Sequence, residues 1–374
     1  MSTVRQPLAA SAAAQAVQVT RSRRSTWWLG LAAVVLVIVL AFLPYLVFSS
    51  TTNLLVNVFI LITMASMWNL LAGYAGLVSV GQQAFVGLGA YGILICAQRG
   101  VNPFLSIPLV VIATGVIGVP VWWLVSRLRT AYFAIATWVI ASVCYLVIVR
   151  FPSLGGGTGT AIPGVLLTMD NNLRLAYTYW AALAVVVAAI GGIYMILRSR
   201  VGLVLTAVRD DEVAARSAGG RVGRVQRFVF VVAAAGCGGA GALLAISQLN
   251  VEPTAAFSVL FSAQMIFATI IGGIGTIEGP ILGTIIFFAL QKSLAQYGTW
   301  YFIVLGLVAM AVALWAPRGI WGLISERFGI RLFPVGYHLW PAGEQRPRGL
   351  AALRRRRPAE TPGAADADPG PPPG

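Results

Sequence analysis

Residues 198–227 read RSRVGLVLTAVRDDEVAARSAGGRVGRVQR, and an apolar run borders them on each side, at 176–197 and at 228–249. Seven arginines and three of the eleven acidic residues of the chain lie in this charged segment. A helix needs about 20 apolar residues to cross a bilayer, so both flanking runs are long enough to span it. The pattern predicts a membrane protein that presents the charged segment to a soluble partner.

The composition also indicates a membrane protein. The chain has 374 residues, of which 58% are hydrophobic and 10% charged, with a mean hydropathy of +0.84. Soluble domains contain about 25% charged residues, so we predict an all-α polytopic integral membrane protein. The net charge of +15 does not indicate nucleic-acid binding, because the arginines lie between and after apolar runs, where they set topology.

Ten apolar runs are candidate transmembrane helices. They cover 27–48, 53–73, 84–98, 104–125, 130–149, 176–197, 228–249, 258–271, 279–297 and 299–316. Two of them, 84–98 and 258–271, are short enough to be re-entrant or broken helices, so we expect eight to ten transmembrane helices. The first run is longer than the roughly 7–15 apolar residues of a signal peptide, so we expect it to be retained.

The positions of lysine and arginine indicate the orientation. If the N-terminus is cytoplasmic, 22 of the 26 Lys and Arg residues lie inside. The four outside are Arg99, Arg150, Arg174 and Lys292, an asymmetry that the positive-inside rule requires. We therefore predict cytoplasmic termini, an N-terminal arm at 1–26, a transmembrane domain at 27–322, and a tail at 323–374 that is disordered from about 340.

A glycine-rich polar segment, NLLAGYAGLVSVGQQAFVGLGAYG at 69–92, follows the second apolar run. Glycine weakens a helix by about 1 kcal/mol relative to alanine but lets helices approach closely in lipid. The segment therefore predicts an interrupted helix, and its small residues also fit a simple packing face. Uncharged polar groups at membrane depth favour a translocation pathway. The candidate lining residues are Asn69, Gly73, Gly76, Ser79, Gly81, Gln82 and Gln83.

This segment resembles a signature of the LivM-type family of branched-chain amino acid ABC transporter permeases. Four further stretches resemble family motifs in the same order: LRTAYFAIAT at 128–137, LGGGTGTAIPG at 154–164, IGGIGTIEGPILG at 271–283 and APRG at 316–319. The second of these departs from the family at its start and at Ala161. The resemblance covers roughly residues 53–322, and the N-terminal arm and the tail have no counterpart in it.

The resemblance implies a permease subunit that moves branched-chain amino acids or similar small polar solutes by alternating access. Its implied partners are a second homologous permease, two ABC ATP-binding subunits and an extracytoplasmic substrate-binding protein. The implied location is the bacterial plasma membrane. In this family the loop at 154–164 lies where a loaded binding protein docks, which makes Gly156, Thr158 and Gly159 candidate contacts.

The sequence AVRDDEVAARSAGG at 207–220 resembles the coupling helix of such importers, which docks on the ATP-binding subunit. The acids fit the positive end of a short helix, and the Gly219-Gly220 pair fits its end. An ordinary loop at the head groups is the alternative, but it gains nothing from three consecutive acids. The candidate coupling residues are Arg209, Asp210, Asp211, Glu212, Ala214, Ala215 and Gly219.

Several features of the chain argue against catalysis. Its glycine-rich stretch at 272–283 lacks the Lys of a phosphate-binding loop and predicts only a tight turn, so ATP hydrolysis is expected in partner subunits. Three cysteines and one histidine show no metal-ligand spacing, and we expect no cofactor. An ion-coupled secondary transporter or a membrane-embedded enzyme would need ionisable residues in the spans. Glu278 is such a residue, either in a polar cavity or at the head-group boundary.

Overall fold

The computed structural model describes residues 17–20, 23–46, 48–128, 130–164, 169–217, 221–294, 300–315, 319–328 and 338–341. The chain divides into two compact units, residues 1–23 with 336–374 and residues 24–335. In the first unit, β1 (Val17–Thr20) pairs antiparallel with β4 (His338–Pro341), and Val17 lies opposite Pro341. The predicted disorder of the tail concerns residues that, after Pro341, lie outside the described residues.

The second unit is built from helices. They are α1 (Arg23–Leu46), α2 (Ser49–Asn69), α3 (Gln83–Gln98), α4 (Pro103–Val125), α5 (Thr130–Val149), α7 (Asn171–Arg198), α8 (Arg200–Asp210), α9 (Glu212–Ser217), α10 (Val222–Gln248), α11 (Pro253–Ala256), α12 (Val259–Gly272), α13 (Glu278–Leu294), α14 (Trp300–Trp315) and α15 (Gly319–Phe328). A π-helical turn, η1 (Leu70–Tyr74), extends α2, and a 3-10 turn, η2 (Pro152–Leu154), follows α5. The two short strands β2 (Thr160–Ala161) and β3 (Asn250–Val251) pair antiparallel.

Six stretches of the described residues form helices long and apolar enough to cross a membrane. They are 49–74, 103–125, 131–149, 171–198, 222–248 and 253–272. Three further apolar runs form α3, α13 and α14, of 16, 17 and 16 residues, and the first forms α1. The all-α multi-pass membrane class is therefore confirmed. Six helices meet the length criterion, whereas the sequence predicted eight to ten spans.

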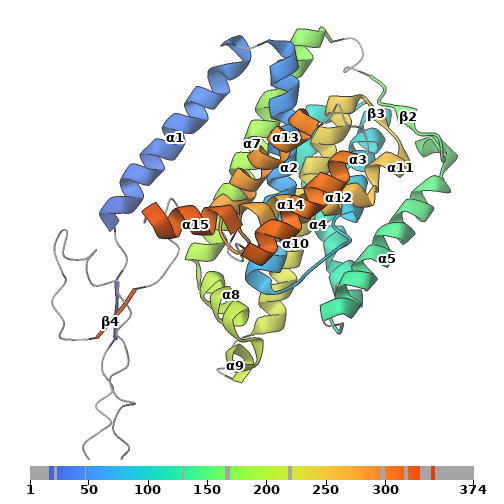
Figure 1. Cartoon of the computed structure of the whole chain (residues 1–374). Coiled ribbons are helices and arrows are strands. Elements are labelled where there is room, and N and C mark those ends of the chain that lie inside the picture. Colours follow the sequence, from blue (N-terminus) through green and yellow to red (C-terminus); the bar gives the residue numbers. More distant parts are fainter. Residues whose placement is uncertain are drawn as a thin grey trace, which may run out of the picture. The chain divides into compact units, whose positions relative to one another are not determined.

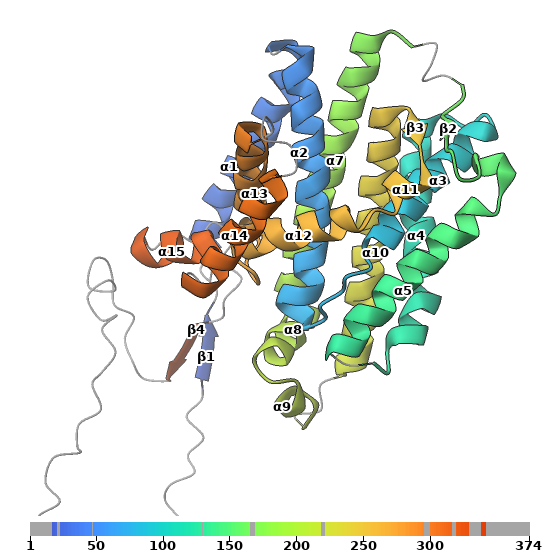
Figure 2. The ribbon, with the colours of Figure 1, turned by 45° about the vertical axis from the view of Figure 1, so that its right-hand side comes forward.

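Helix α10 lies at the centre of the unit and packs against α2, α3, α4 and α7 (Figures 1 and 2). Its central turns consist of small residues, and a Cβ on Gly241 would overlap the backbone carbonyl of Val86 in α3. Likewise, a Cβ on Gly89 would overlap the carbonyl of Gly238. In lipid, helices associate through close packing and hydrogen bonds, so these glycines allow the contact that holds α3 on α10.

Burial separates the inner helices from the outer ones. In an 18-residue apolar window of the helices at 49–74 and 222–248, 78% of the residues are buried, against 22% in such a window of α5. The exposed side chains of α5 are large and apolar, as at Tyr132, Ile135 and Leu146, which suits contact with lipid or with a neighbouring membrane subunit. Helix α12 runs across α2 instead of alongside it (Figure 2).

The charged segment and the loop at 154–164 lie at opposite ends of the bundle (Figure 1). Helices α8 and α9 form most of the charged segment at one end. At the other end, β2 pairs with β3 and the Gln98 side chain donates to the Ser153 carbonyl. This arrangement agrees with the predicted topology, in which the two segments face opposite sides of the membrane. Which side is cytoplasmic stays a prediction.

The close contact between α3 and α10 gives a direct test. We expect Gly241→Ala to lower the free energy of unfolding by about 1–3 kcal/mol, because the added methyl group must push α10 away from Val86. Gly191→Ala in α7 is the matched control, since a Cβ there meets no atom within 4 Å. It should be neutral or stabilising by up to about 1 kcal/mol. Thermal unfolding of the purified chain in detergent measures both, and equal effects would refute the packing argument.

Candidate functional site

The helix that begins as α2 is interrupted, as the glycine-rich segment predicted. The α2 helix widens into the π-helical turn η1, and the chain is then non-helical from Gly76 until α3 begins at Gln83. Gly76 adopts a positive φ of 69°, which a residue with a side chain rarely does. Single π-turns within helices are frequent at functional sites, so the end of α2 is a candidate.

Asn69 joins this helix end to the turn between α12 and α13. Its Oδ1 accepts a hydrogen bond from the backbone N–H of Gly275 at 2.8 Å, and its Nδ2 donates to the carbonyl of Thr276 at 2.7 Å. The side chain is 2% exposed. Both backbone groups lie outside a helix and need partners when buried, so a single amide satisfies two polar groups of the turn.

Glycines allow the turn to come this close. Gly273 and Gly275 have positive φ values of 131° and 74°. A Cβ on Gly73 in η1 would lie 2.6 Å from the Gly275 nitrogen, and a Cβ on Gly319 at the start of α15 would overlap Gly273. A tight turn lies within the predicted stretch at 272–283, but it covers only 273–277, because α13 already begins at Glu278. The turn packs between the end of α2 and the start of α15.

Arg209, in the last turn of α8, attaches the charged segment to the same turn. Its guanidinium Nη1 donates a hydrogen bond to the carbonyl of Gly275 at 3.1 Å. The peptide groups of Gly275 are therefore held from two sides, the N–H by Asn69 and the carbonyl by Arg209. We call the residues Asn69, Gly73, Arg209, Gly275 and Thr276 the junction.

Other contacts fix the charged segment around the junction. The Val208 side chain of α8 packs with Ala215 of α9 and Val222 at the start of α10 in a small apolar cluster. The amide of Gln226 donates to the carbonyl of Ala75, just beyond η1, at 3.3 Å. Helix α8 therefore contacts the α12–α13 turn directly, through Arg209, and is linked to the end of α2 through α10.

The sequence predicted one short helix in the charged segment, and the structure has two. Asp210 ends α8, Asp211 lies between the helices, and Glu212 begins α9. The additional helix, α8, has a recognisable start, because the Ser199 side chain accepts from the backbone N–H of Val201, as an N-cap does. Ala215 is buried against Val208 and Val222, the Ala214 side chain is not described, and Gly219 lies outside the described residues.

The predicted pathway residues after Gly76 are buried inside the bundle. Ser79, Gln82 and Gln83 are at most 1% exposed. The Gln82 amide donates to the Ser79 hydroxyl at 3.4 Å, and Gln83 Oε1 accepts from Ser262 of α12. Within the described part of the chain, Gln82 Oε1 has no hydrogen-bond partner. Gln83 thus lies where α3 faces α12, and the role of all three side chains as a pathway lining stays a prediction.

Packing explains Gly81, the remaining glycine of that segment, and gives Thr137 of α5 a contact that its motif did not indicate. A Cβ on Gly81 would overlap the carbonyl of Thr137 in α5, and the Thr137 hydroxyl accepts from the backbone N–H of Val80 at 3.2 Å. The backbone at 80–81 is therefore pressed against α5. Thr137 and Ser262 are too far along the chain from this segment for local spacing to have indicated them.

The other candidate residues lie apart from the junction. Gly156 and Gly159 have positive φ values of 54° and 79°, and the Thr158 hydroxyl donates to the Gly155 carbonyl at 3.2 Å, all at the end of the bundle opposite α8. Glu278 lies in the first turn of α13, and its side chain is buried, with 8% of its surface exposed. Among the described residues no group of three or more His, Cys, Asp or Glu could hold a metal ion.

Comparison with known proteins places most of this unit in one family. Residues 50–314 match the family model described as branched-chain amino acid transport system / permease component. The chain is 26% identical over 303 residues to the high-affinity branched-chain amino acid transport system permease protein LivM of Escherichia coli (strain K12), covering 74% of this chain and 71% of that protein.

Two further relatives are similar to this chain. The LivM protein of Salmonella typhimurium is 25% identical over 303 residues, with 74% of this chain and 71% of that protein covered. The probable branched-chain amino acid transport permease protein LivH of Methanocaldococcus jannaschii is 26% identical over 262 residues, with 65% and 82% covered. No solved structure matches this chain. The matched range contains every residue of the junction.

The two hydrogen bonds of Asn69 predict that replacing its side chain strongly destabilises the fold. We expect Asn69→Ala to lower the free energy of unfolding by about 2–3 kcal/mol, because it leaves the Gly275 N–H and the Thr276 carbonyl buried without partners. Asn57→Ala is the matched control, since that amide bonds the Asn53 carbonyl at an exposed position of the same helix. It should change stability by less than about 0.5 kcal/mol. Thermal unfolding in detergent compares them, and similar losses would contradict the assignment.

Proposed function

The chain belongs to the family of branched-chain amino acid transport system permease components, and on that basis we propose that it moves such solutes by alternating access. Membership makes it the non-catalytic transmembrane subunit of an ABC transport system, as the sequence motifs predicted. The ion-coupled transporter and the membrane-embedded enzyme are thereby set aside. The names of the LivM relatives support leucine, isoleucine and valine as the solute class.

We propose the partners that an ABC importer requires. They are a second homologous permease, two ATP-binding subunits and an extracytoplasmic substrate-binding protein, assembled in the bacterial plasma membrane. The charged segment faces the cytoplasm in this proposal, where its arginines satisfy the positive-inside rule. The loop with Gly156, Thr158 and Gly159 then faces the binding protein, because it lies at the opposite end of the bundle.

The ATP-binding subunit docks on α8 and α9, and the junction carries its movement into the membrane. The observation that supports this step is the backbone of Gly275, whose N–H donates to Asn69 and whose carbonyl accepts from Arg209. A shift of α8 displaces the α12–α13 turn through the hydrogen bond of Arg209. The turn then displaces the end of α2 through the hydrogen bonds of Asn69. Coupling between distant sites needs such a contiguous element that both can bias.

The pathway opens where α12 faces α3. The two helices meet through the Gln83–Ser262 hydrogen bond, and the Phe257 ring, just before α12, fills the space above Gly87. Gln82 Oε1, buried and unpartnered in the described residues, would gain a polar partner when the helices separate. The buried amides of Gln82 and Gln83 and the hydroxyl of Ser79 then line the route that the sequence predicted.

Arg209 gives the sharpest test of the coupling step. In the assembled transporter in proteoliposomes, we expect Arg209→Gln to lower solute uptake per ATP hydrolysed about five-fold, since a partly exposed hydrogen bond of about 1 kcal/mol is lost. ATP hydrolysis itself should persist, because the ATP-binding subunits are intact.

Arg224→Gln is the control, an exposed arginine of the same charged segment. It should leave uptake per ATP unchanged. Unchanged coupling in Arg209→Gln would remove the junction from the mechanism. An equal fall in both variants would mean that the net charge of the segment matters and not the Gly275 contact.

A further inference from the structure

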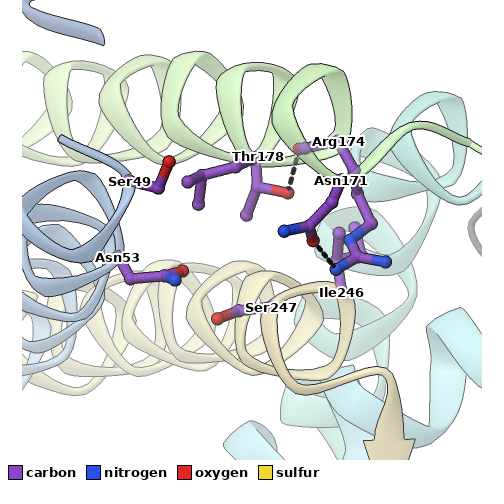
Figure 3. A pocket seen from close by; sticks show the side chains of 8 residues that line it. Ser49, Asn53, Asn171, Arg174, Thr178, Ile246 and Ser247 are labelled. Atoms are coloured by element: carbon purple, nitrogen blue, oxygen red, sulfur yellow. Dashed lines mark hydrogen bonds between the residues drawn. The ribbon is translucent and has the colours of Figure 1, made fainter.

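A polar cavity of about 90 Å³ lies between α2, α7 and α10, at the end of α2 away from the junction (Figure 3). Its polar lining residues are Ser49, Asn53, Asn171, Arg174, Thr178 and Ser247. Ser49 begins α2 and Asn69 ends it, so at 1.5 Å per residue the cavity and the junction are about 30 Å apart. The cavity therefore belongs to the outer end of the subunit in the proposed orientation.

Several side chains that face the cavity keep their hydrogen-bonding capacity free. Ser49 and Asn53 of α2 and Ser247 of α10 line the hollow, and the Asn53 amide extends into it (Figure 3). Within the described residues these three side-chain groups have no hydrogen-bond partner. A cavity with unused donors and acceptors on two sides is suited to a small polar solute.

The charge of the cavity selects the kind of solute. Arg174 is the one charged residue that lines it, and its guanidinium is positioned by a hydrogen bond to Asn171 Oδ1. The nearby Asp170 caps α7 by accepting from the Asn172 backbone N–H at 3.2 Å, and it does not line the cavity. Because α2 and α7 both begin here, at Ser49 and Asn171, the positive ends of their dipoles add to the charge of Arg174.

We propose that this cavity binds the carboxylate of a free amino acid on its way into the transporter, with Arg174 as the counter-ion. The assignment rests on the proposed function and adds a binding subsite to it. Guanidinium groups bind carboxylates through paired, charge-assisted hydrogen bonds. The Asn53 amide and the Ser247 hydroxyl are placed to accept the ammonium protons of the same solute.

The size of the cavity limits which part of an amino acid can bind in it. A water molecule needs roughly 10–15 Å³ of such volume, so about 90 Å³ holds the polar end of an amino acid but not a large side chain as well. The site therefore binds the carboxylate and ammonium groups, while the aliphatic side chain remains outside the cavity. It discriminates solutes that carry a carboxylate from those that do not, and it discriminates leucine only weakly from valine.

Saturation-transfer NMR on the purified chain in lipid nanodiscs tests the site with three probes. L-leucine carries both charges, isovalerate only the carboxylate and leucinamide only the ammonium group. We expect L-leucine and isovalerate to bind and leucinamide not to bind. Arg174→Gln should weaken L-leucine binding about ten-fold, and Arg150→Gln, an exposed arginine at the same end, should leave it unchanged.

Asn53→Ala is a second variant, from a different helix and without a hydrogen bond to lose, so it should fold normally and weaken L-leucine binding several-fold. Equal binding by wild type and Arg174→Gln, or no binding by wild type, overturns the inference. Uptake by the assembled transporter is measured in parallel, and normal uptake then leaves the proposed function intact. The inference is also wrong if Arg174→Gln prevents the soluble substrate-binding protein from binding this chain but leaves L-leucine binding unchanged. Arg174 then contacts a carboxylate of that protein and not the carboxylate of the amino acid.

Discussion

The backbone of Gly275 is the point where four separate parts of the chain meet. Asn69 bonds its N–H, Arg209 bonds its carbonyl, and Gly73 and Gly319 lie so close to its turn that a side chain on either would collide. The rest of the structure depends on this constraint, because it joins the charged segment outside the bundle to the buried end of α2. Without the amide of Asn69, the turn would bury two polar backbone groups with no partner.

The bundle follows the same physical rule at α10. Lipid provides no hydrophobic force between helices, so small residues and backbone contact supply the association. Gly89 and Gly241 allow α3 and α10 to touch, while the apolar side chains of α5 face outward. In the proposed mechanism, a displacement of α8 reaches the α12–α13 turn through Arg209 and the end of α2 through Asn69.

Much of this fold could be predicted from residue patterns, because apolar length decides the spans and glycine decides the interruption at Gly76. The motif at 271–283 also predicted its tight turn. The hydrogen bond between Asn69 and Gly275 could not be predicted, since the two residues are 206 positions apart and nothing local relates them. The helix α8 was missed although Ser199 provides an N-cap, because the resemblance to a coupling helix indicated a single short helix that begins at the acidic residues. The crossing of α12 over α2 depends on tertiary packing and has no signal in the sequence.

The proposed mechanism depends on separate ATP-binding subunits, which bind α8 and α9 and supply the energy for transport. The most direct measurement is purification of the tagged chain from its native membrane in mild detergent, with identification of every protein that accompanies it. The account predicts a second permease together with P-loop ATPases, and loss of the ATPases when Asp210, Asp211 and Glu212 are replaced by alanine. A chain that purifies alone and still moves its solute down an ion gradient would contradict it.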